Sequence, residues 1–262
     1  MSTDIFSAFC LAGTNSGCGK TIISTALIAA LRNRGLSVAP FKCGPDYIDP
    51  SYHSAAAGKN SVNLDSWIMN RKTLAESFIR NSSDSRVAIV EGVMGLFDGA
   101  SSSLTHGSTA GCAKSLGLPV ILVVNASGLS GSIAAIVYGF LKLAVGIKIC
   151  GVIANKTGSN NHKRLLADAL KANSLPPLLG AFPKNPDFQI PERHLGLLPF
   201  TESRKLRTFF DNLANAAEEH LDIDSILRVS RIKRKAFSPV PYPKAKYQAV
   251  VLRDEAFSFY YP

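Results

Sequence analysis

Short apolar runs alternate with helical patterns along most of this 262-residue chain. Runs that are apolar throughout are typical of strands buried on both faces of a sheet, and a helix between successive strands lets them pair in parallel. The sequence therefore predicts an α/β fold, with a doubly wound, mostly parallel sheet and helices on both faces. The apolar runs cover residues 6–11, 38–42, 87–90, 120–125, 149–155 and 177–182, and the helical patterns cover residues 20–34, 72–80, 108–116, 130–143, 161–172 and 201–220.

The segment between the first apolar run and the first helical pattern is rich in glycine. It has one residue more between its outer glycines than the usual Walker A spacing. Glycines let backbone N–H groups converge on an anion, and the positive end of the following helix adds to the attraction. A P-loop NTPase-like fold that binds ATP is therefore predicted, with a turn that binds nothing as the alternative. The nucleotide contacts would be Gly13, Thr14, Asn15, Ser16, Gly17, Cys18, Gly19, Lys20 and Thr21.

Carboxylates at strand ends are the natural further ligands for the Mg²⁺ that accompanies ATP. Glu91 directly follows the apolar run at residues 87–90, and Asp46 and Asp49 lie in a proline-flanked loop after the run at residues 38–42. Asp98 lies between glycines in the loop that follows Glu91. Because these runs end at the same edge of a parallel sheet as Lys20, we expect the four carboxylates near the phosphates. The alternatives are an acidic residue that starts a loop for Glu91, helix-capping Asx turns for Asp46 and Asp49, and an ordinary turn for Asp98.

The composition narrows the kind of protein. The five cysteines include no C-x-x-C pair and lie mostly in apolar runs, with Cys18 in the loop, which indicates reduced thiols in a cytoplasmic protein. Residues 133–154 are interrupted by lysines and glycines, so a helix followed by a buried strand is favoured over a membrane span. The formal charge of +10 favours an acidic partner such as a nucleotide, a nucleic acid, an anionic lipid or a polycarboxylate.

The C-terminal part has a different character. Basic residues and three prolines without an apolar period fill much of residues 223–247, which is typical of a linker. A strand-like run follows at residues 249–252 with no further element to pair against. We therefore expect a nucleotide-binding domain over residues 1–222, a basic, proline-containing linker over residues 223–247, and the first strand of a further domain over residues 248–262.

Several segments together resemble the cobyrinate a,c-diamide synthase family, the glutamine-dependent amidotransferases of the cobalamin pathway. These are GTNSGCGKT, KCGPDYIDPSYH, EGVMGLFDG, ANKTGSNNH and PERHLGLLP, while RDEAFSFYYP resembles the start of the family's glutaminase domain. The family's synthetase domain is similar to dethiobiotin synthetase, which also makes a carboxylate reactive with ATP. Partitioning and septum-placement ATPases differ, because they carry a lysine in the loop where this sequence has Asn15.

The resemblance implies ATP-dependent amidation of the a- and c-side-chain carboxylates of cobyrinic acid. The γ-phosphoryl group of ATP would be transferred to a carboxylate, and ammonia would then displace phosphate from the acyl phosphate. The cofactors would be ATP and Mg²⁺, and the partners would be the corrinoid polycarboxylate and ammonia derived from glutamine. The chain could form a homodimer, and neither nucleic acid nor a membrane is expected as a partner.

The resemblance also assigns roles to residues. Those carrying the chemistry would be Lys20, Asp46, Asp49, Glu91 and Asp98, and Mg²⁺ would be held by Thr21, Asp46 and Glu91. The corrinoid would contact Tyr47, Asp49, Asp98, His162 and Arg193. The nucleotide base would contact Asn155 and Lys156, at the end of the fifth apolar run. A surface position without a ligand is the alternative for His162.

This family makes ammonia with a class I glutaminase domain, whose nucleophile is a cysteine in a sharp turn backed by a histidine. None of the five cysteines has that setting, so we expect this chain to bind ATP but not to hydrolyse glutamine. Three other functions remain open. They are a related diamide synthase that acts on nickel sirohydrochlorin, a nucleotide switch like the partitioning ATPases, and a module that binds nucleotide and corrinoid without turnover.

Overall fold

A parallel sheet forms the centre of the computed structural model, which describes residues 5–188, 204–234, 247–252, 254 and 260. The strand order is β3-β2-β4-β1-β5-β6-β7, and β8 pairs antiparallel with the start of β1. After β1 the chain forms β2, β3 and β4 on one side of β1 and then crosses to β5 on the other side. A topological switch therefore lies beside β1. The strands are β1 Ile5–Gly13, β2 Val38–Cys43, β3 Val62–Leu64, β4 Val87–Gly95, β5 Val120–Asn125, β6 Ile149–Thr157, β7 Leu178–Pro183 and β8 Arg231–Lys233.

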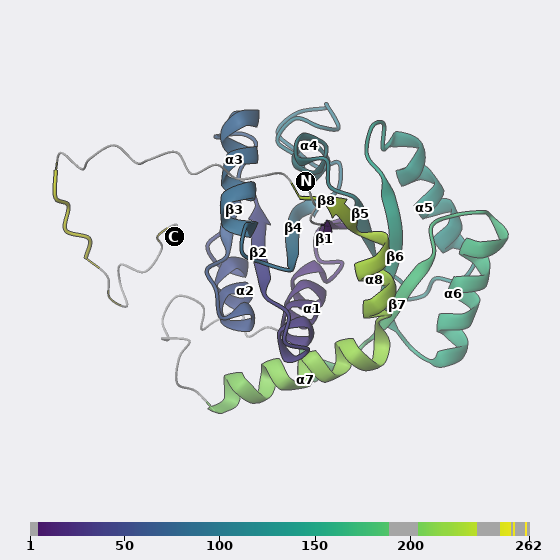
Figure 1. The fold of residues 1–262 in the computed structure, drawn as a ribbon. Helices are drawn as coiled ribbons and strands as arrows, with labels where there is room; N and C mark the ends of the chain where they lie inside the picture. The colour runs from purple at the N-terminus through teal and green to yellow at the C-terminus, as the bar shows by residue number, and fades with distance from the viewer. Residues whose placement is uncertain (1–4, 189–203, 235–246, 253, 255–259, 261–262) are drawn as a thin grey trace.

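Helices cover both faces of this sheet, and each face has its own apolar core. The side chains of β1 alternate between them: Phe6, Ala8 and Cys10 face the core under α3–α6, while Phe9 and Leu11 face the core under α1, α7 and α8. In Figure 1, α7 crosses the molecule beneath α1. The helices are α1 Lys20–Asn33, α2 Asp49–Ala57, α3 Arg71–Ser82, α4 Thr109–Leu116, α5 Ser132–Leu143, α6 Asn160–Ala172, α7 Arg204–His220 and α8 Ile223–Val229, with a 3₁₀ turn at Pro186–Phe188.

The predicted fold class is confirmed, and so is the helix followed by a strand at residues 133–154, which fold as α5 and β6. Among the helices of the described residues, none combines the length and the hydropathy that crossing a membrane requires. All five cysteines are free and buried, including Cys18 in the glycine-rich loop. The short elements α2, β3, α8 and β8 were not predicted, because three to nine residues are too few to establish a period.

The predicted linker begins too early. Residues 223–233 form α8 and β8, and Ile223 and Ile226 are buried in the core beneath α7. Arg234, counted among the linker's basic residues, places its guanidinium 4.0 Å from the ring centre of Phe6 and donates hydrogen bonds to the carbonyls of Ser82 and Ser85. A basic run can therefore belong to a folded domain when its stems pack on apolar groups.

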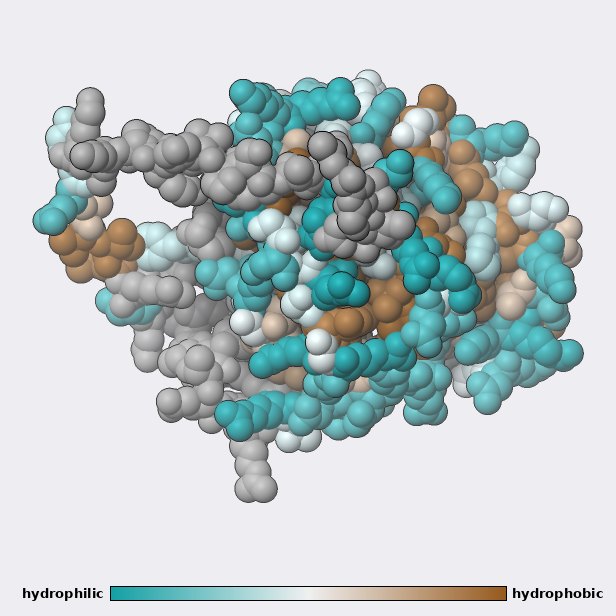
Figure 2. Space-filling model, viewed as in Figure 1, coloured by the Kyte–Doolittle hydropathy of each residue, from teal (hydrophilic) through white to brown (hydrophobic). Residues whose placement is uncertain are grey.

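The strand predicted at residues 249–252 is not formed among the described residues. This segment has no regular secondary structure, and Val250 is 90% exposed. The apolar side chains of this segment form the brown group at the left of Figure 2. A strand needs a neighbouring backbone to satisfy its N–H and C=O groups, and none of the described residues supplies one. Residues 235–246 lie outside the described part, so the rest of the predicted linker and the further domain stay predictions.

Candidate nucleotide and carboxylate site

The glycine-rich loop joins the end of β1 to the start of α1 at the carboxyl edge of the sheet. Gly19 has a φ of 98°, and a Cβ there would lie 1.9 Å from the side-chain nitrogen of Asn155, so only glycine fits. No side chain of the described residues caps α1, and its first turn contains no acidic residue. The first N–H groups of the helix are therefore left for an anion such as a phosphate.

Asn155, at the end of β6, braces this loop from the side. Its amide donates a 2.8 Å hydrogen bond to the carbonyl of Cys18, and its oxygen accepts from the N–H of Lys156, which has a left-handed φ of 58°. Of the two residues of the predicted base contact, Asn155 thus touches the phosphate loop, and Lys156 is its neighbour in the chain. Their contact with a nucleotide base stays a prediction.

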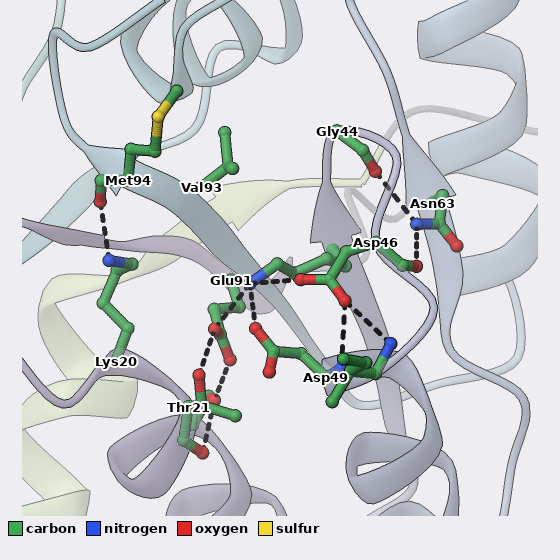
Figure 3. A network of polar contacts seen from close by, with 12 residues as sticks. Lys20, Thr21, Gly44, Asp46, Asp49, Asn63, Glu91, Val93 and Met94 are labelled. Carbon is green, nitrogen blue, oxygen red and sulfur yellow. Dashed lines mark hydrogen bonds and ion pairs between the residues drawn. The ribbon is translucent and has the colours of Figure 1, made fainter. Parts of the chain in front are cut away.

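Lys20 is buried and points across the loop towards β4. Its Nζ donates to the carbonyl of Met94 over 2.6 Å and lies 3.5 Å from the carbonyl of Asn15 (Figure 3). Met94 adopts a left-handed φ of 48°, which is strained for a residue with a side chain. Two neutral carbonyls are weaker partners for an ammonium group than phosphate oxygens. An arriving triphosphate would therefore displace them.

Glu91, on β4, lies at the centre of a cluster of polar side chains and is fully buried. Its Oε1 accepts hydrogen bonds from the Thr21 hydroxyl at 2.9 Å and from Lys42 Nζ at 2.8 Å. Its Oε2 accepts from the Ser24 hydroxyl and from His53 Nε2, the latter at 2.7 Å. The Thr21 contact joins the phosphate loop directly to Glu91, which lies within β4 and, through Lys42, is linked to the carboxylates of the loop after β2.

Lys42, on β2, is the cation of this cluster and is only 3% exposed. Its ammonium group contacts the carboxylates of Asp49, of Glu91 at 2.8 Å and of Asp46 at 3.4 Å. Lys42 was not among the predicted site residues, because in the sequence it is the last residue of an apolar run. The available signal was a charged residue in a strand predicted to be buried on both faces, where an unpaired charge is strongly disfavoured.

These charges shift each other's pKa values. Burial alone would lower the pKa of Lys42, but the carboxylates of Glu91, Asp49 and Asp46 outweigh it and raise the pKa above its usual value. For Glu91, burial opposes ionisation, while Lys42 and His53 together hold its pKa well below its usual range. Burial and the charge of Glu91 raise the pKa of Asp49 to about 6, although Lys42 opposes them. Asp49 thus takes up a proton more readily than an ordinary aspartate does.

Asp46 has two separate roles. Its Oδ1 accepts hydrogen bonds from the N–H groups of Ile48 at 2.8 Å and Asp49 at 3.1 Å, so the alternative of an Asx turn before α2 is realised. Its other oxygen faces Lys42. Asn63 on β3 fixes the same loop, because its amide donates to the carbonyls of Gly44 at 2.9 Å and Asp46 at 2.8 Å (Figure 3). Asn63 was not among the site residues predicted from the sequence.

The remaining predicted residues are spread around this centre. Asp98 accepts a 2.9 Å hydrogen bond from the N–H of Gly95, as in an ordinary turn, next to the phosphate loop. Tyr47 is partly exposed at the tip of the loop after β2. His162 lies in the first turn of α6, where its Nε2 is 2.7 Å from the carbonyl of Leu129, so its contacts are internal. Arg193 lies outside the described residues.

The oxygen donors near Lys20 suit Mg²⁺ bound with a nucleotide. The described residues contain no ready cluster of three or more histidine, cysteine, aspartate or glutamate ligands for a metal ion. Mg²⁺ in nucleotide sites, however, needs only one or two protein oxygens, because phosphates and water supply the others. Thr21 and Glu91 already touch, and Asp46 faces the same ammonium group as Glu91. A hydroxyl and carboxylates of this kind fit a hard divalent cation.

A family model and several curated relatives match most of the chain. Residues 9–198 match the CbiA family model, described as the CobQ/CobB/MinD/ParA nucleotide binding domain. The chain is 44% identical to cobyrinate a,c-diamide synthase of Dehalococcoides mccartyi (strain CBDB1), a match that covers 98% of this chain and 57% of that protein. It is 40% identical to cobyrinate a,c-diamide synthase of Priestia megaterium, covering 96% of this chain and 55% of that protein.

A related name occurs among the other relatives. The chain is 42% identical to hydrogenobyrinate a,c-diamide synthase of Brucella anthropi (strain ATCC 49188), over 97% of this chain and 58% of that protein. It therefore spans little more than half the length of the curated relatives it matches. Among solved structures, chloroplast FtsY from Physcomitrella patens has a TM-score of 0.51 at 14% identity, covering 79% of this chain and 65% of that chain. That likeness concerns the fold alone.

Proposed function

The chain belongs to the CobQ/CobB/MinD/ParA nucleotide-binding family. From this membership and from the names of its relatives, we propose that it amidates carboxylates of a corrinoid with ATP, as a cobyrinate a,c-diamide synthase. One observation carries the proposal. The phosphate loop is joined through Thr21 to the buried carboxylate Glu91, which shares the Lys42 ammonium group with Asp46 and Asp49. A triphosphate and an organic acid can meet at such an edge, because fixed cations there neutralise both.

The proposed reaction has two steps. A carboxylate oxygen of the substrate attacks the γ-phosphorus of ATP, the bond to the bridging oxygen breaks, and ADP leaves. Ammonia then attacks the carbonyl carbon of the acyl phosphate, the bond between that carbon and the phosphate oxygen breaks, and phosphate leaves with the amide formed. The extra proton of the attacking nitrogen goes to phosphate or to solvent.

The chain's own residues contribute position and charge. Lys20 would exchange the Met94 carbonyl for the β- and γ-phosphate oxygens and stabilise the charge that develops on them. Thr21, Asp46 and Glu91 would hold Mg²⁺, which when bound neutralises phosphate charge. Lys42 would keep its contact with Asp49 and would also face the incoming carboxylate, since Asp46 and Glu91 would be shared with the metal. Asp49 and Asp98 would orient the substrate.

The substrate class and nitrogen source follow from the relatives. Proteins named for cobyrinate and for hydrogenobyrinate are 40–44% identical to the chain, so the proposed substrate is a corrinoid polycarboxylate of this kind. The net charge of +10 would raise its local concentration. Ammonia would come from glutamine through a further domain, in keeping with the greater length of the relatives. Free cysteine thiols fit a cytoplasmic enzyme.

The test incubates the chain with ATP, Mg²⁺, ammonium and candidate tetrapyrroles, and follows the product by mass spectrometry. We expect two carboxylate-to-amide conversions on cobyrinic acid or hydrogenobyrinic acid, each coupled to one phosphate released. Lys20→Ala should abolish turnover, and Lys59→Ala, which breaks the partly exposed pair of Lys59 with Asp84, should not. Corrinoid-independent ATP hydrolysis, or full activity in Lys20→Ala, would refute the proposal. Conversion of nickel sirohydrochlorin alone would assign the chain to that substrate instead.

A further inference from the structure

Large apolar side chains are left exposed beside the carboxylate cluster. Trp67 and Ile68 follow β3 and are 63% and 71% exposed. Tyr47 and Ile48 after β2, Met94 at the end of β4 and Leu104 in the loop after β4 are also exposed. Exposed apolar groups that gather at one edge of a domain indicate a binding surface, whereas scattered ones need no explanation.

Hydrogen bonds to the buried Asp65 fix the turn that carries Trp67 and Ile68. Asp65 is buried, and its Oδ1 accepts a hydrogen bond from the N–H of Trp67 at 2.8 Å, while its carbonyl accepts from the N–H of Met69 at 2.8 Å. Met69 packs against the core, so both ends of the turn are anchored. The two side chains are therefore presented to solvent by a built turn.

Trp67 also meets the loop that follows β4. Its ring lies 5.1 Å from that of His106, at an interplanar angle of 45°. Since β2 lies between β3 and β4 in the sheet, this contact joins the segments that follow the two neighbours of β2, the strand that leads into the loop with Asp46 and Asp49. The loop of His106 starts against the phosphate loop, where the N–H of Leu96 donates to the carbonyl of Gly13 at 2.8 Å. The aromatic pair is thus continuous with the proposed site.

We propose that Trp67, Ile68 and His106 form a platform for one face of the tetrapyrrole ring, a role that rests on the function proposed above. A flat macrocycle with charged groups at its rim needs an apolar surface for the ring and cations for the rim. The platform supplies the first, and the cations at the same edge of the sheet are Lys20 at the start of α1 and Lys42 near the end of β2. A ring seated on Trp67 would direct one peripheral carboxylate towards the phosphate loop, and the platform would set the corrinoid KM.

Trp67 is the only tryptophan of the chain, so its fluorescence reports on the platform directly. Cobyrinic acid, added without ATP, should quench the emission saturably. Trp67→Ala and Ile68→Ala should each raise the corrinoid KM by about tenfold, the loss expected for one aromatic or aliphatic contact, and leave the ATP KM unchanged. Trp67→Phe should keep most of the affinity. Tyr138→Ala, which removes an exposed ring from α5 on another part of the surface, should change neither KM.

A double variant controls for light absorbed by the corrinoid. Trp67→Phe with Tyr138→Trp moves the only indole to α5, where no saturable quenching is expected. An unchanged corrinoid KM in both alanine variants, or unquenched Trp67 emission at saturating corrinoid, would overturn the platform while leaving the proposed reaction intact. If the unsubstituted chain amidates no corrinoid, the proposed function fails, and quenching still decides whether the ring binds at Trp67.

Discussion

Replacing Lys42 with methionine should reveal how strongly the carboxylate cluster depends on one buried cation. Lys42 is 3% exposed and contacts three carboxylates, and one of these, Glu91, is fully buried. Removing one partner of a buried ion pair costs about 3–5 kcal/mol, because the remaining charge is left without compensation. For a chain of 262 residues this corresponds to a fall in Tm on the order of 10 °C.

The assay is thermal and urea unfolding of the ligand-free chain at pH 8, followed by circular dichroism, with and without Mg²⁺ and ATP. Lys59→Met is the matched control, because the Lys59 pair with Asp84 is much more exposed, at 33% and 73%, and should contribute less than about 1 kcal/mol. Mg²⁺ with ATP should recover part of the stability lost in Lys42→Met, since bound cation again neutralises Glu91.

A Lys42→Met chain that unfolds at the same temperature as Lys59→Met would refute this account of the cluster. If Lys42→Met yields no folded protein, the same chain with Asp49→Asn added has one carboxylate fewer and should regain the fold. Where both single variants fold, they form a cycle with the double variant, and a coupling free energy near zero would show that Lys42 and Asp49 act independently.

The other expectations concern the pH and metal dependence of the same cluster. Because burial and Glu91 raise the pKa of Asp49 to about 6, the folded chain holds this proton more tightly than the unfolded chain between about pH 4 and 6. The parent chain should therefore lose stability relative to Asp49→Asn as the pH rises from 4 to 7 without Mg²⁺, by at most about 3 kcal/mol; a difference that stays constant with pH in urea titrations would contradict this. His53→Ala removes one of the two hydrogen-bond partners of Glu91 Oε2. It should raise the Mg²⁺ concentration needed for half-maximal binding of fluorescent ATP by about tenfold, and His53→Gln should recover part of this loss. Identical Mg²⁺ curves for His53→Ala and the parent would exclude a role for His53 in positioning Glu91.

Much of the architecture was determined by local sequence patterns. Uninterrupted apolar runs can only be satisfied by strands covered on both faces, and the glycines before Lys20 permit a backbone that other residues would obstruct. Since parallel strands end at one edge, the same patterns predicted that Lys20, Asp46 and Glu91 would lie near each other. The contact between Thr21 and Glu91 agrees with that expectation.

Other features were decided by the tertiary structure alone. A lysine in an apolar run, a histidine in a nine-residue helix and an asparagine in a three-residue strand carry no period that marks them. Lys42, His53 and Asn63 acquire roles only through the arrangement of the elements. With β2 between β3 and β4, Lys42 and His53 reach Glu91, and Asn63 reaches the loop after β2. The same holds for β8, whose basic residues resemble a linker until they pair with β1. Local pattern reports which backbone a segment adopts, whereas the partners of a buried charge depend on which segments the folded chain places beside it.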